Sequence, residues 1–289
     1  MTRMDGKVVL ITGATNGIGK VAALELAKMG ATVVLVGRNQ AKTQATVDEI
    51  KNGSGSSQIE SLIADLSVMS EVRRLAEEFK AKYTRLDVLL NNAGAVFADR
   101  QETDDGYEMT FALNHLSYFL LTNLLLDLLK ASAPARIVNV SSGAHMGGRL
   151  NFEDLNRQKG YGLGGYGAYG QSKLANVMFT YELARRLAGT GVTATVLHPG
   201  FVATGFGRNV PGLMARLMPL MHRLALTPEE GAQTMIFLAS SPNVEGVTGK
   251  YFDKCKVVSS SKASYNEADQ RQLWAVSEEM TGLKTAAPV

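Results

Sequence analysis

Tyr169 and Lys173 are the first residues in this sequence whose types and spacing suggest chemistry. The segment that includes Lys173, KLANVMFTYELARRLA, has helical periodicity, and residues four apart on a helix lie one above the other on the same face. A phenol would then lie beside an ammonium, and a neighbouring positive charge lowers the pKa of a phenol towards the range of a general acid or base. The same spacing occurs on many solvated helices, so the surrounding elements must distinguish proton transfer from coincidence.

A glycine-rich turn lies between the first predicted strand and the first predicted helix. The strand spans residues 7–12 (KVVLIT), and the helix after the turn ends at Gly30. In such a turn Gly13 permits a tight bend, Gly17 lets backbone amides approach a pyrophosphate, and Gly19 allows the helix to pack closely. A turn directly after a strand and at the start of a helix predicts a dinucleotide site. The same loop supplies the further candidate contacts Thr15, Asn16 and Ile18.

Strands and helices alternate along the rest of the chain. The predicted strands have near-continuous runs of valine, isoleucine and leucine, which is typical of strands buried on both faces of a sheet. They span residues 7–12, 31–36, 61–64, 86–90, 135–140 and 192–197. The predicted helices span residues 18–30, 39–51, 67–83, 104–130, 169–188 and 267–280. Without an internal repeat or a linker, this order predicts one α/β domain over residues 1–289, a Rossmann-type doubly wound parallel sheet with helices on both faces.

Composition disfavours several classes of protein. The 289 residues are 45% hydrophobic and 20% charged, which is ordinary for a globular protein. A net charge of +3 without a cationic block does not favour nucleic acid as a partner. Cys255 is the only cysteine, so no internal disulfide forms, and this suits a reducing, cytoplasmic location. The four histidines have no ligand-like spacing, so no metal site is expected.

No transmembrane segment is expected. The first residues, MTRMDGKVVLITG, lack the long apolar core of a signal peptide and lead directly into a strand. The most apolar long stretch, residues 116–129, is interrupted by polar side chains and is too short to cross a bilayer. We interpret it as a helix that is buried or that faces another subunit.

The chemically distinctive residues follow the ends of successive predicted strands. In a doubly wound sheet, ligands bind outside the carboxyl ends of the strands. Purely structural residues would have no reason to choose that edge repeatedly, so the pattern indicates a cofactor site. It also supports a chemical role for Tyr169 and Lys173. The strands after the first are followed in turn by Arg38, Asp65, Asn91 to Gly94, Ser141-Ser142 and Pro199-Gly200.

The residues after the second strand indicate which dinucleotide binds. An acidic residue there would hold the ribose hydroxyls of NAD, but residues 35–40 contain no acid and offer Arg38. A guanidinium suits a 2′-phosphate through paired, charge-assisted hydrogen bonds, so NADP(H) is preferred and NAD(H) is the alternative. The competing interpretation is that Arg38 only lies in solvent at the edge of the sheet.

These motifs together resemble the short-chain dehydrogenase/reductase family, over nearly the whole chain. The resemblance rests on the TGxxxGxG spacing from Thr12, Asn91-Asn92-Ala93-Gly94, Asn114, Ser142, Tyr169-x-x-x-Lys173 and Pro199-Gly200. LNHLSYFLLTNLLL, SAPARIVNVSS, GTGVTATVLHPG and the tail GKYFDKCK resemble the retinol dehydrogenase-like branch. The chain departs from the pattern at Asn16, where NADP-using relatives often have a basic residue.

The resemblance implies roles at the reaction centre. Tyr169 would be the acid/base, and Lys173 would lower its pKa and hold the nicotinamide ribose. Ser142, selected over Ser141 by the family spacing from Tyr169, would position the substrate oxygen, and two hydroxyl donors aimed at that oxygen stabilise its developing charge. Asn114 would hold a water that links Lys173 to solvent.

The resemblance also implies further contacts to the cofactor. Asp65 and Leu66 would lie at the adenine, although an acid at a strand end could equally cap the next helix. Asn92, Ala93 and Gly94 would lie beside the adenosine half. The segment near the nicotinamide and the phosphates would contribute Pro199, Gly200, Val202 and Thr204.

Residues 208–226 carry the information on the substrate. Their leucines and methionines form an apolar helical pattern that Pro219 interrupts and basic residues flank. We expect a lid over a lipophilic substrate; a helix packed in the core or against another subunit fits equally, and a membrane-surface helix is a further alternative. His145 is expected to be a solvated loop residue. The glycine-rich residues 160–170 are expected to form a flexible approach to the Tyr169 helix.

The sequence therefore predicts an NADP(H)-dependent oxidoreductase that interconverts an aldehyde or ketone and the matching alcohol. A non-catalytic dinucleotide-binding sensor or scaffold on the same fold is the alternative from another class. A reductase of carbon–carbon double bonds, like the protochlorophyllide reductases, is a third. The resemblance implies a homodimer or homotetramer paired through residues 116–129 and 169–188. The helix at 267–280 would cover an edge of the core or interfere with that interface.

Overall fold

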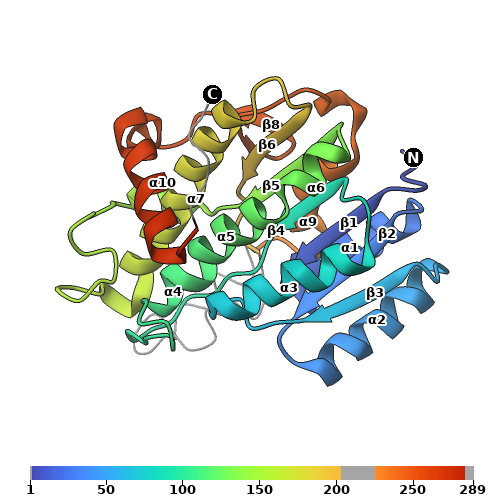
Figure 1. Ribbon diagram of the computed structural model, residues 1–289, viewed down its shortest axis with the longest axis horizontal. Helices are drawn as coiled ribbons and strands as arrows, with labels where there is room; N and C mark the ends of the chain where they lie inside the picture. Colours follow the sequence, from blue (N-terminus) through green and yellow to red (C-terminus); the bar gives the residue numbers. More distant parts are fainter. Residues whose placement is uncertain (1, 203–224, 284–289) are drawn as a thin grey trace.

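Figure 1 presents a computed structural model, which describes residues 2–202 and 225–283. Its centre is one sheet with the strand order β3-β2-β1-β4-β5-β6-β7-β8. Neighbouring strands are parallel except β7 and β8, which form an antiparallel hairpin. The strands are β1 (Val8–Thr12), β2 (Thr32–Gly37), β3 (Ile59–Ile63), β4 (Val88–Asn91), β5 (Ala135–Val140), β6 (Val192–Leu197), β7 (Lys250–Asp253) and β8 (Lys256–Val258).

Helices cover both faces of the sheet (Figure 1). One face carries α1 (Gly17–Lys28), α2 (Gln40–Ser54) and α9 (Pro228–Ser240). The other carries α3 (Met69–Lys82), α4 (Met109–Phe111), α5 (Ser117–Leu124), α6 (Leu126–Ala131), α7 (Tyr166–Arg186) and α10 (Glu267–Thr281). None of the described helices is both long enough and apolar enough to span a membrane.

Strand β1 explains how one sheet supports two apolar layers. Its side chains alternate between the faces, because successive residues of a strand point in opposite directions. Val8 and Leu10 belong to the layer beneath α3, α5 and α7, and Val9 and Ile11 to the layer beneath α1, α2 and α9. The predicted fold, a doubly wound parallel sheet covered on both faces, is therefore confirmed.

The predicted helix at 104–130 is shorter and less regular than expected. It begins at Met109, continues through a π-helical turn over Ala112–Leu116, and is interrupted again at Leu125 between α5 and α6. A π-helical turn carries one extra residue and is frequent at functional sites. Asn114 lies within this turn.

The β7–β8 hairpin and helix α9 were not predicted. The strands β7 and β8 are short, and β8 is exposed along its length, so neither has a clear hydrophobic pattern. Their turn uses Lys254 and Cys255 in the left-handed conformation, at φ 47° and 61°, instead of glycine. Helix α9 had a readable signal, because Thr227, Pro228 and Glu230 form a capping box with proline at the first turn.

Helix α7 is buried on all sides within the monomer. Every residue from Ala168 to Ala184 is buried, and α10 covers the side that faces away from the sheet. Trp274 of α10 lies with its ring centroid 5.0 Å from that of Phe119 and 5.8 Å from that of Phe179, and the guanidinium of Arg186 lies 4.1 Å from its centroid. The expected C-terminal helix therefore covers the core.

Candidate active site

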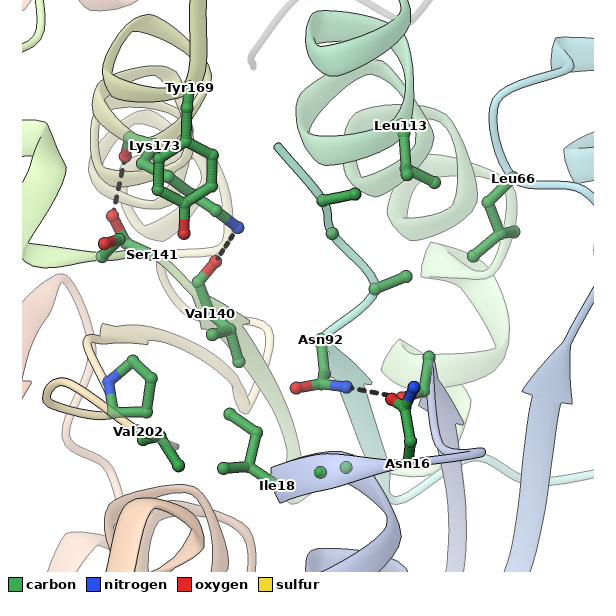
Figure 2. A pocket seen from close by; sticks show the side chains of 18 of the residues that line it. Asn16, Ile18, Leu66, Asn92, Leu113, Val140, Ser141, Tyr169, Lys173 and Val202 are labelled. Atoms are coloured by element: carbon green, nitrogen blue, oxygen red, sulfur yellow. Dashed lines mark hydrogen bonds between the residues drawn. The ribbon is translucent and has the colours of Figure 1, made fainter. Parts of the chain in front are cut away.

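The carboxyl ends of the parallel strands surround a cavity of about 830 Å³. Figure 2 shows side chains from the glycine loop, from β4 and from α7 converging on it. Every expected cofactor contact among the described residues lines it, and Thr204 lies outside the described part. The expected residues that line it are Gly13, Thr15, Asn16, Gly17, Ile18, Gly19, Arg38, Asp65, Leu66, Asn92, Ala93, Gly94, Ser142, Tyr169, Lys173, Pro199, Gly200 and Val202.

The glycine loop leaves no room for side chains. Gly13 has φ 66°, and a Cβ added there would lie 2.7 Å from Cα of Ala93. A Cβ added to Gly19 would lie 2.6 Å from the carbonyl oxygen of Gly13. These approaches keep the backbone of the loop tight against the β4 end. Because these glycines have no side chains, a ligand such as a pyrophosphate can approach the backbone atoms of the loop closely.

The side chain of Asn92 holds this loop in place. Its Nδ2 donates hydrogen bonds to the carbonyl oxygens of Thr12, at 2.9 Å, and Gly13, at 3.0 Å (Figure 2). The hydroxyl of Thr12 accepts from the backbone amides of Asn92 and Ala93. The asparagine-rich motif after β4 therefore fixes the glycine turn as well as lining the cavity.

The start of α1 faces the same cavity. Asn16 caps this helix without a side-chain hydrogen bond to its first turn. The first amides of a helix have no partner within the helix and attract anions together with the helix dipole. This end of the cavity therefore fits a phosphate group.

Arg38 and Asp65 form the outer end of the cavity. The Arg38 side chain is 76% exposed and its Nη1 lies 3.3 Å from Oδ2 of Asp65, so this pair is weakly held. Asp65 also accepts hydrogen bonds from the amide and the hydroxyl of Ser67. Burial raises the pKa of Asp65, but these bonds and the charge of Arg38 outweigh it and hold that pKa below its usual range. The described helix after Asp65 is capped at Val68 instead.

Tyr169 and Lys173 both project from the first half of α7 into the inner end of the cavity (Figure 2). They are 7% and 3% exposed. The ammonium Nζ of Lys173 donates to the carbonyl oxygen of Val140 at 3.0 Å, at the end of β5. Its distance to the centroid of the Tyr169 ring is 5.7 Å. The lysine thus lies beside the face of the tyrosine ring.

The two adjacent serines after β5 have different roles. The hydroxyl of Ser141 donates to the carbonyl oxygen of Lys173 at 2.8 Å and so ties β5 to α7. The hydroxyl of Ser142 accepts from the amide of Ala144 and forms a hydrogen bond with Tyr169. Ser142 is therefore the serine that shares a polar cluster with the tyrosine.

The pKa shifts at this pair differ from the sequence expectation. Burial raises the pKa of Tyr169, and the hydrogen bond with Ser142 only partly opposes it. Burial also lowers the pKa of Lys173 to about 7. The expected lowering of the tyrosine pKa by Lys173 is not found, because the ammonium lies beside the ring face and burial dominates the shift.

Asn114 lies behind the cavity and does not line it. Its Oδ1 accepts from the amide of Ala95 at 2.9 Å, and its Nδ2 donates to the carbonyl of Ala95 and to Ser172 Oγ, each at 3.0 Å. Its backbone carbonyl accepts from Nδ2 of Asn176 at 2.9 Å. The side chain therefore joins the loop after β4 to α7.

His145 is not the solvated residue that its loop position suggested. It is fully buried, its Nδ1 lies 2.7 Å from the carbonyl oxygen of Ser142, and its Nε2 accepts from the amide of Ser261 at 3.2 Å. Its ring centroid lies 4.8 Å from that of Tyr251 on β7. The partners that bury it lie far along the chain, which is why the local sequence gave no sign of them.

The cavity is also lined by apolar side chains. They include Phe97, Met109, Leu113, Tyr166 and Phe201. Most of the expected lid, residues 208–224, lies outside the described residues. Among the described residues, no group of three or more histidine, cysteine, aspartate or glutamate side chains could hold a metal ion.

The glycine-rich approach to α7 packs tightly. The hydroxyl of Tyr161 donates to the carbonyl oxygen of Phe97 at 2.9 Å. A Cβ added to Gly165, which has φ 77°, would lie 1.9 Å from the same oxygen. These glycines let this segment lie against the backbone of the loop at Phe97. Close packing therefore explains why glycine is needed there.

Comparison with known proteins identifies the family. The model for short chain dehydrogenases matches residues 7–154 and 156–212. This chain belongs to the short-chain dehydrogenase family. Retinol dehydrogenase 14 of Homo sapiens is 46% identical, over 97% of this chain and 88% of that protein. Retinol dehydrogenase 12 of Bos taurus is 45% identical, over 98% of this chain and 88% of that protein.

Solved structures of the family have the same fold. An uncharacterised protein from Mycobacterium paratuberculosis superposes with a TM-score of 0.80 and 33% identity, over 99% of this chain and 97% of that chain. The Pseudomonas aeruginosa RhlG/NADP active-site complex superposes with a TM-score of 0.70 and 30% identity, over 86% of this chain and 95% of that chain. The predicted family and its retinol dehydrogenase-like relatives are thus confirmed.

Proposed function

We propose that this short-chain dehydrogenase uses NADP(H) to interconvert a lipophilic aldehyde or ketone and the matching alcohol. The observation that carries the proposal is the meeting of Tyr169, Lys173 and Ser142 in a cavity that the glycine loop also lines. The apolar side chains that line the cavity support a lipophilic substrate. Hydride chemistry is what a nicotinamide dinucleotide supplies when it is bound.

Each side chain then has a defined task. Tyr169 donates a proton to the carbonyl oxygen, and Ser142 donates a hydrogen bond to the same oxygen as negative charge develops on it. Burial keeps Tyr169 protonated at neutral pH, which suits reduction of the carbonyl. Lys173 lies beside the ring of Tyr169 and, when charged, favours loss of the tyrosine proton.

Arg38 is the basis for preferring NADP(H). Its exposed guanidinium lines the outer end of the cavity, and its partner among the described residues is Asp65. A 2′-phosphate offers a stronger, charge-assisted pairing than this exposed contact. The solved relative with bound NADP adds support from the family. Arg38→Ala is expected to weaken NADPH binding by about tenfold and to leave NADH binding nearly unchanged.

The test compares two tyrosines that line the same cavity. A panel of retinal, aliphatic aldehydes, steroids and polar ketones is offered with NADPH and NADH in parallel. Tyr169→Phe is expected to lower kcat at least a hundredfold with little change in NADPH affinity. Tyr166→Phe, on a side chain that is 42% exposed, is the matched control and should keep its turnover. Equal turnover of the parent and Tyr169→Phe would contradict the acid/base role and favour the dinucleotide-binding sensor.

Assembly and location are proposed separately. We infer a cytoplasmic protein from the single cysteine. A homodimer or homotetramer is expected from the family, but α10 covers α7 in the monomer, so pairing through α7 would require α10 to move. Light scattering of the full chain gives the mass in solution, and a monomer at micromolar concentration would contradict the expected assembly.

A further inference from the structure

Lys173 is a buried side chain whose nitrogen has no counter-ion among the described residues. None of the ion pairs within that part of the chain includes it, and its Nζ donates a hydrogen bond to the carbonyl oxygen of Val140. A buried charge that lacks compensation is costly and tends to become neutral. The balance between the charged and neutral forms of this lysine therefore depends on the uncharged groups around it.

Two aromatic rings face the lysine nitrogen from different helices. The Nζ atom lies 5.6 Å from the ring centroid of Tyr118 on α5 and 5.7 Å from that of Tyr169 on α7. The face of an aromatic ring carries partial negative charge, and its attraction for a cation grows when both are removed from water. Tyr118 is 1% exposed, so this contact is desolvated.

The remaining neighbours of Lys173 within residues 2–202 and 225–283 are uncharged. Strand β5 presents the carbonyl of Val140, and the loop after β4 presents the backbone of Gly94, where an added Cβ would lie 3.2 Å from Nζ. Tyr169 on the same helix and Tyr118 on α5 are the titratable side chains that face it. Burial raises the pKa of Tyr118, so its ring stays neutral.

The hydroxyl of Tyr118 makes a second contact at the site. It donates to the carbonyl oxygen of Ala93 at 2.8 Å. Ala93 lies in the loop that lines the cavity and that packs against Gly13 of the glycine turn. One side chain thus contacts both the lysine and the loop that shapes the expected cofactor site.

We propose that Tyr118 is a positioning residue for the reaction: its ring face favours the charged form of Lys173, and its hydroxyl holds the Ala93 loop in the shape that the cofactor needs. The proposal rests on the proposed oxidoreductase function, in which a charged Lys173 assists Tyr169. It does not require Tyr118 to touch the substrate.

The experiment varies the charge on the ring face at nearly constant size. The variants are Tyr118→Phe and three proteins with mono-, di- or trifluorinated phenylalanine in place of Tyr118. Each is prepared with ¹³C-labelled lysine. The titration of Lys173 is followed by NMR at Cε and assigned by its loss in Lys173→Arg. Each fluorine withdraws electrons from the ring face, so the pKa of Lys173 should fall stepwise, by about one unit in total. That fall is a tenfold lower ratio of charged to neutral lysine.

The variants separate the ring from the hydroxyl. Tyr118→Phe keeps the ring and should titrate like the parent, but it should bind NADPH about fivefold more weakly through loss of the bond to Ala93. Tyr118→Leu removes the ring as well and should shift the Lys173 titration most. Because a neutral lysine no longer assists Tyr169, the alkaline limb of carbonyl reduction should move to lower pH in the fluorinated series.

The outcomes are distinct. An identical Lys173 titration across the fluorinated series would overturn the proposed role of the ring, even if Tyr118→Leu does not fold. Unchanged NADPH affinity in Tyr118→Phe would overturn the role of the hydroxyl. A parent that turns over no carbonyl compound, with the stepwise titration intact, would instead overturn the proposed oxidoreductase function alone.

Discussion

His145 should hold the Ser142 turn in place, and its removal should be costly. The ring is fully buried, with Nδ1 2.7 Å from the carbonyl oxygen of Ser142 and Nε2 3.2 Å from the amide nitrogen of Ser261. His145→Ala leaves the amide of Ser261 unpaired, at about 1 to 3 kcal/mol, and removes one of the two hydrogen bonds to the carbonyl oxygen of Ser142, at about 1 kcal/mol, because the backbone amide of residue 145 still donates to that oxygen. It also loses about 1 kcal/mol of ring contact with Tyr251. We expect the free energy of unfolding to fall by about 3 to 5 kcal/mol.

Two amide variants divide this loss between the two ring nitrogens. In His145→Asn the side-chain amide can take the place of Nδ1 and donate to Ser142, and in His145→Gln the amide oxygen can take the place of Nε2 and accept from Ser261. Both should be destabilised by about 2 kcal/mol in urea unfolding followed by fluorescence. Only His145→Asn should keep most of the parent kcat, because it alone keeps the bond next to the catalytic serine.

Protonation of His145 should act like these substitutions. An imidazolium would turn a second N–H towards the amide of Ser261, and burial already holds the pKa of His145 below its usual value. The stability that the neutral ring contributes is present above the unfolded pKa of about 6.5 and is lost as pH falls below it. The reasoning is refuted if the free energy of unfolding of His145→Ala is within about 0.5 kcal/mol of the parent's. It is also refuted if His145→Asn and His145→Gln have equal kcat.

Three further variants test other parts of the structure. Asp87 is 2% exposed and accepts hydrogen bonds from the amide of Val8 and from two cationic side chains. Asp87→Asn should therefore lower the free energy of unfolding, measured by urea denaturation, by about 2 kcal/mol. Burial lowers the pKa of His115 to about 4, so about 3 kcal/mol of stability, present above pH 6.5, should be lost as pH falls towards 4; His115→Gln should flatten that dependence of the urea midpoint. Gly13→Ala would place Cβ against the adjacent loop and should weaken NADPH binding more than tenfold by titration calorimetry, whereas Gly6→Ala, at a similar φ of 71° with open space around it, should not.

The sequence was most informative where function depends on neighbouring residues. The glycine loop, the strand ends and the Tyr169/Lys173 spacing are local patterns, and the structure brings them to one cavity. The two serines that follow β5 have different partners in the structure, and the family spacing from Tyr169 was the signal that selected Ser142 in advance.

The sequence was least informative where a side chain depends on distant partners. His145 bonds to Ser261, which is 116 positions away, and Tyr118 bonds to Ala93, which is 25 positions away. The residues next to His145 in the sequence give no sign of its burial. Tyr118 lies in the apolar stretch at 116–129, so its burial could be expected, but its bond to Ala93 could not. The direction of the Tyr169 pKa shift could not be read either, because it depends on burial and on where the lysine nitrogen points.

The cover of α10 over α7 has a consequence for biosynthesis. A ribosome completes Tyr169 and Lys173 long before it reaches Trp274, so all the proposed catalytic residues exist in a chain that still lacks the cover over Phe179. Until that cover arrives, the apolar side of α7 is open to chaperones and proteases. A transcript cut short between the two helices would therefore encode every catalytic residue and still yield a product marked for degradation.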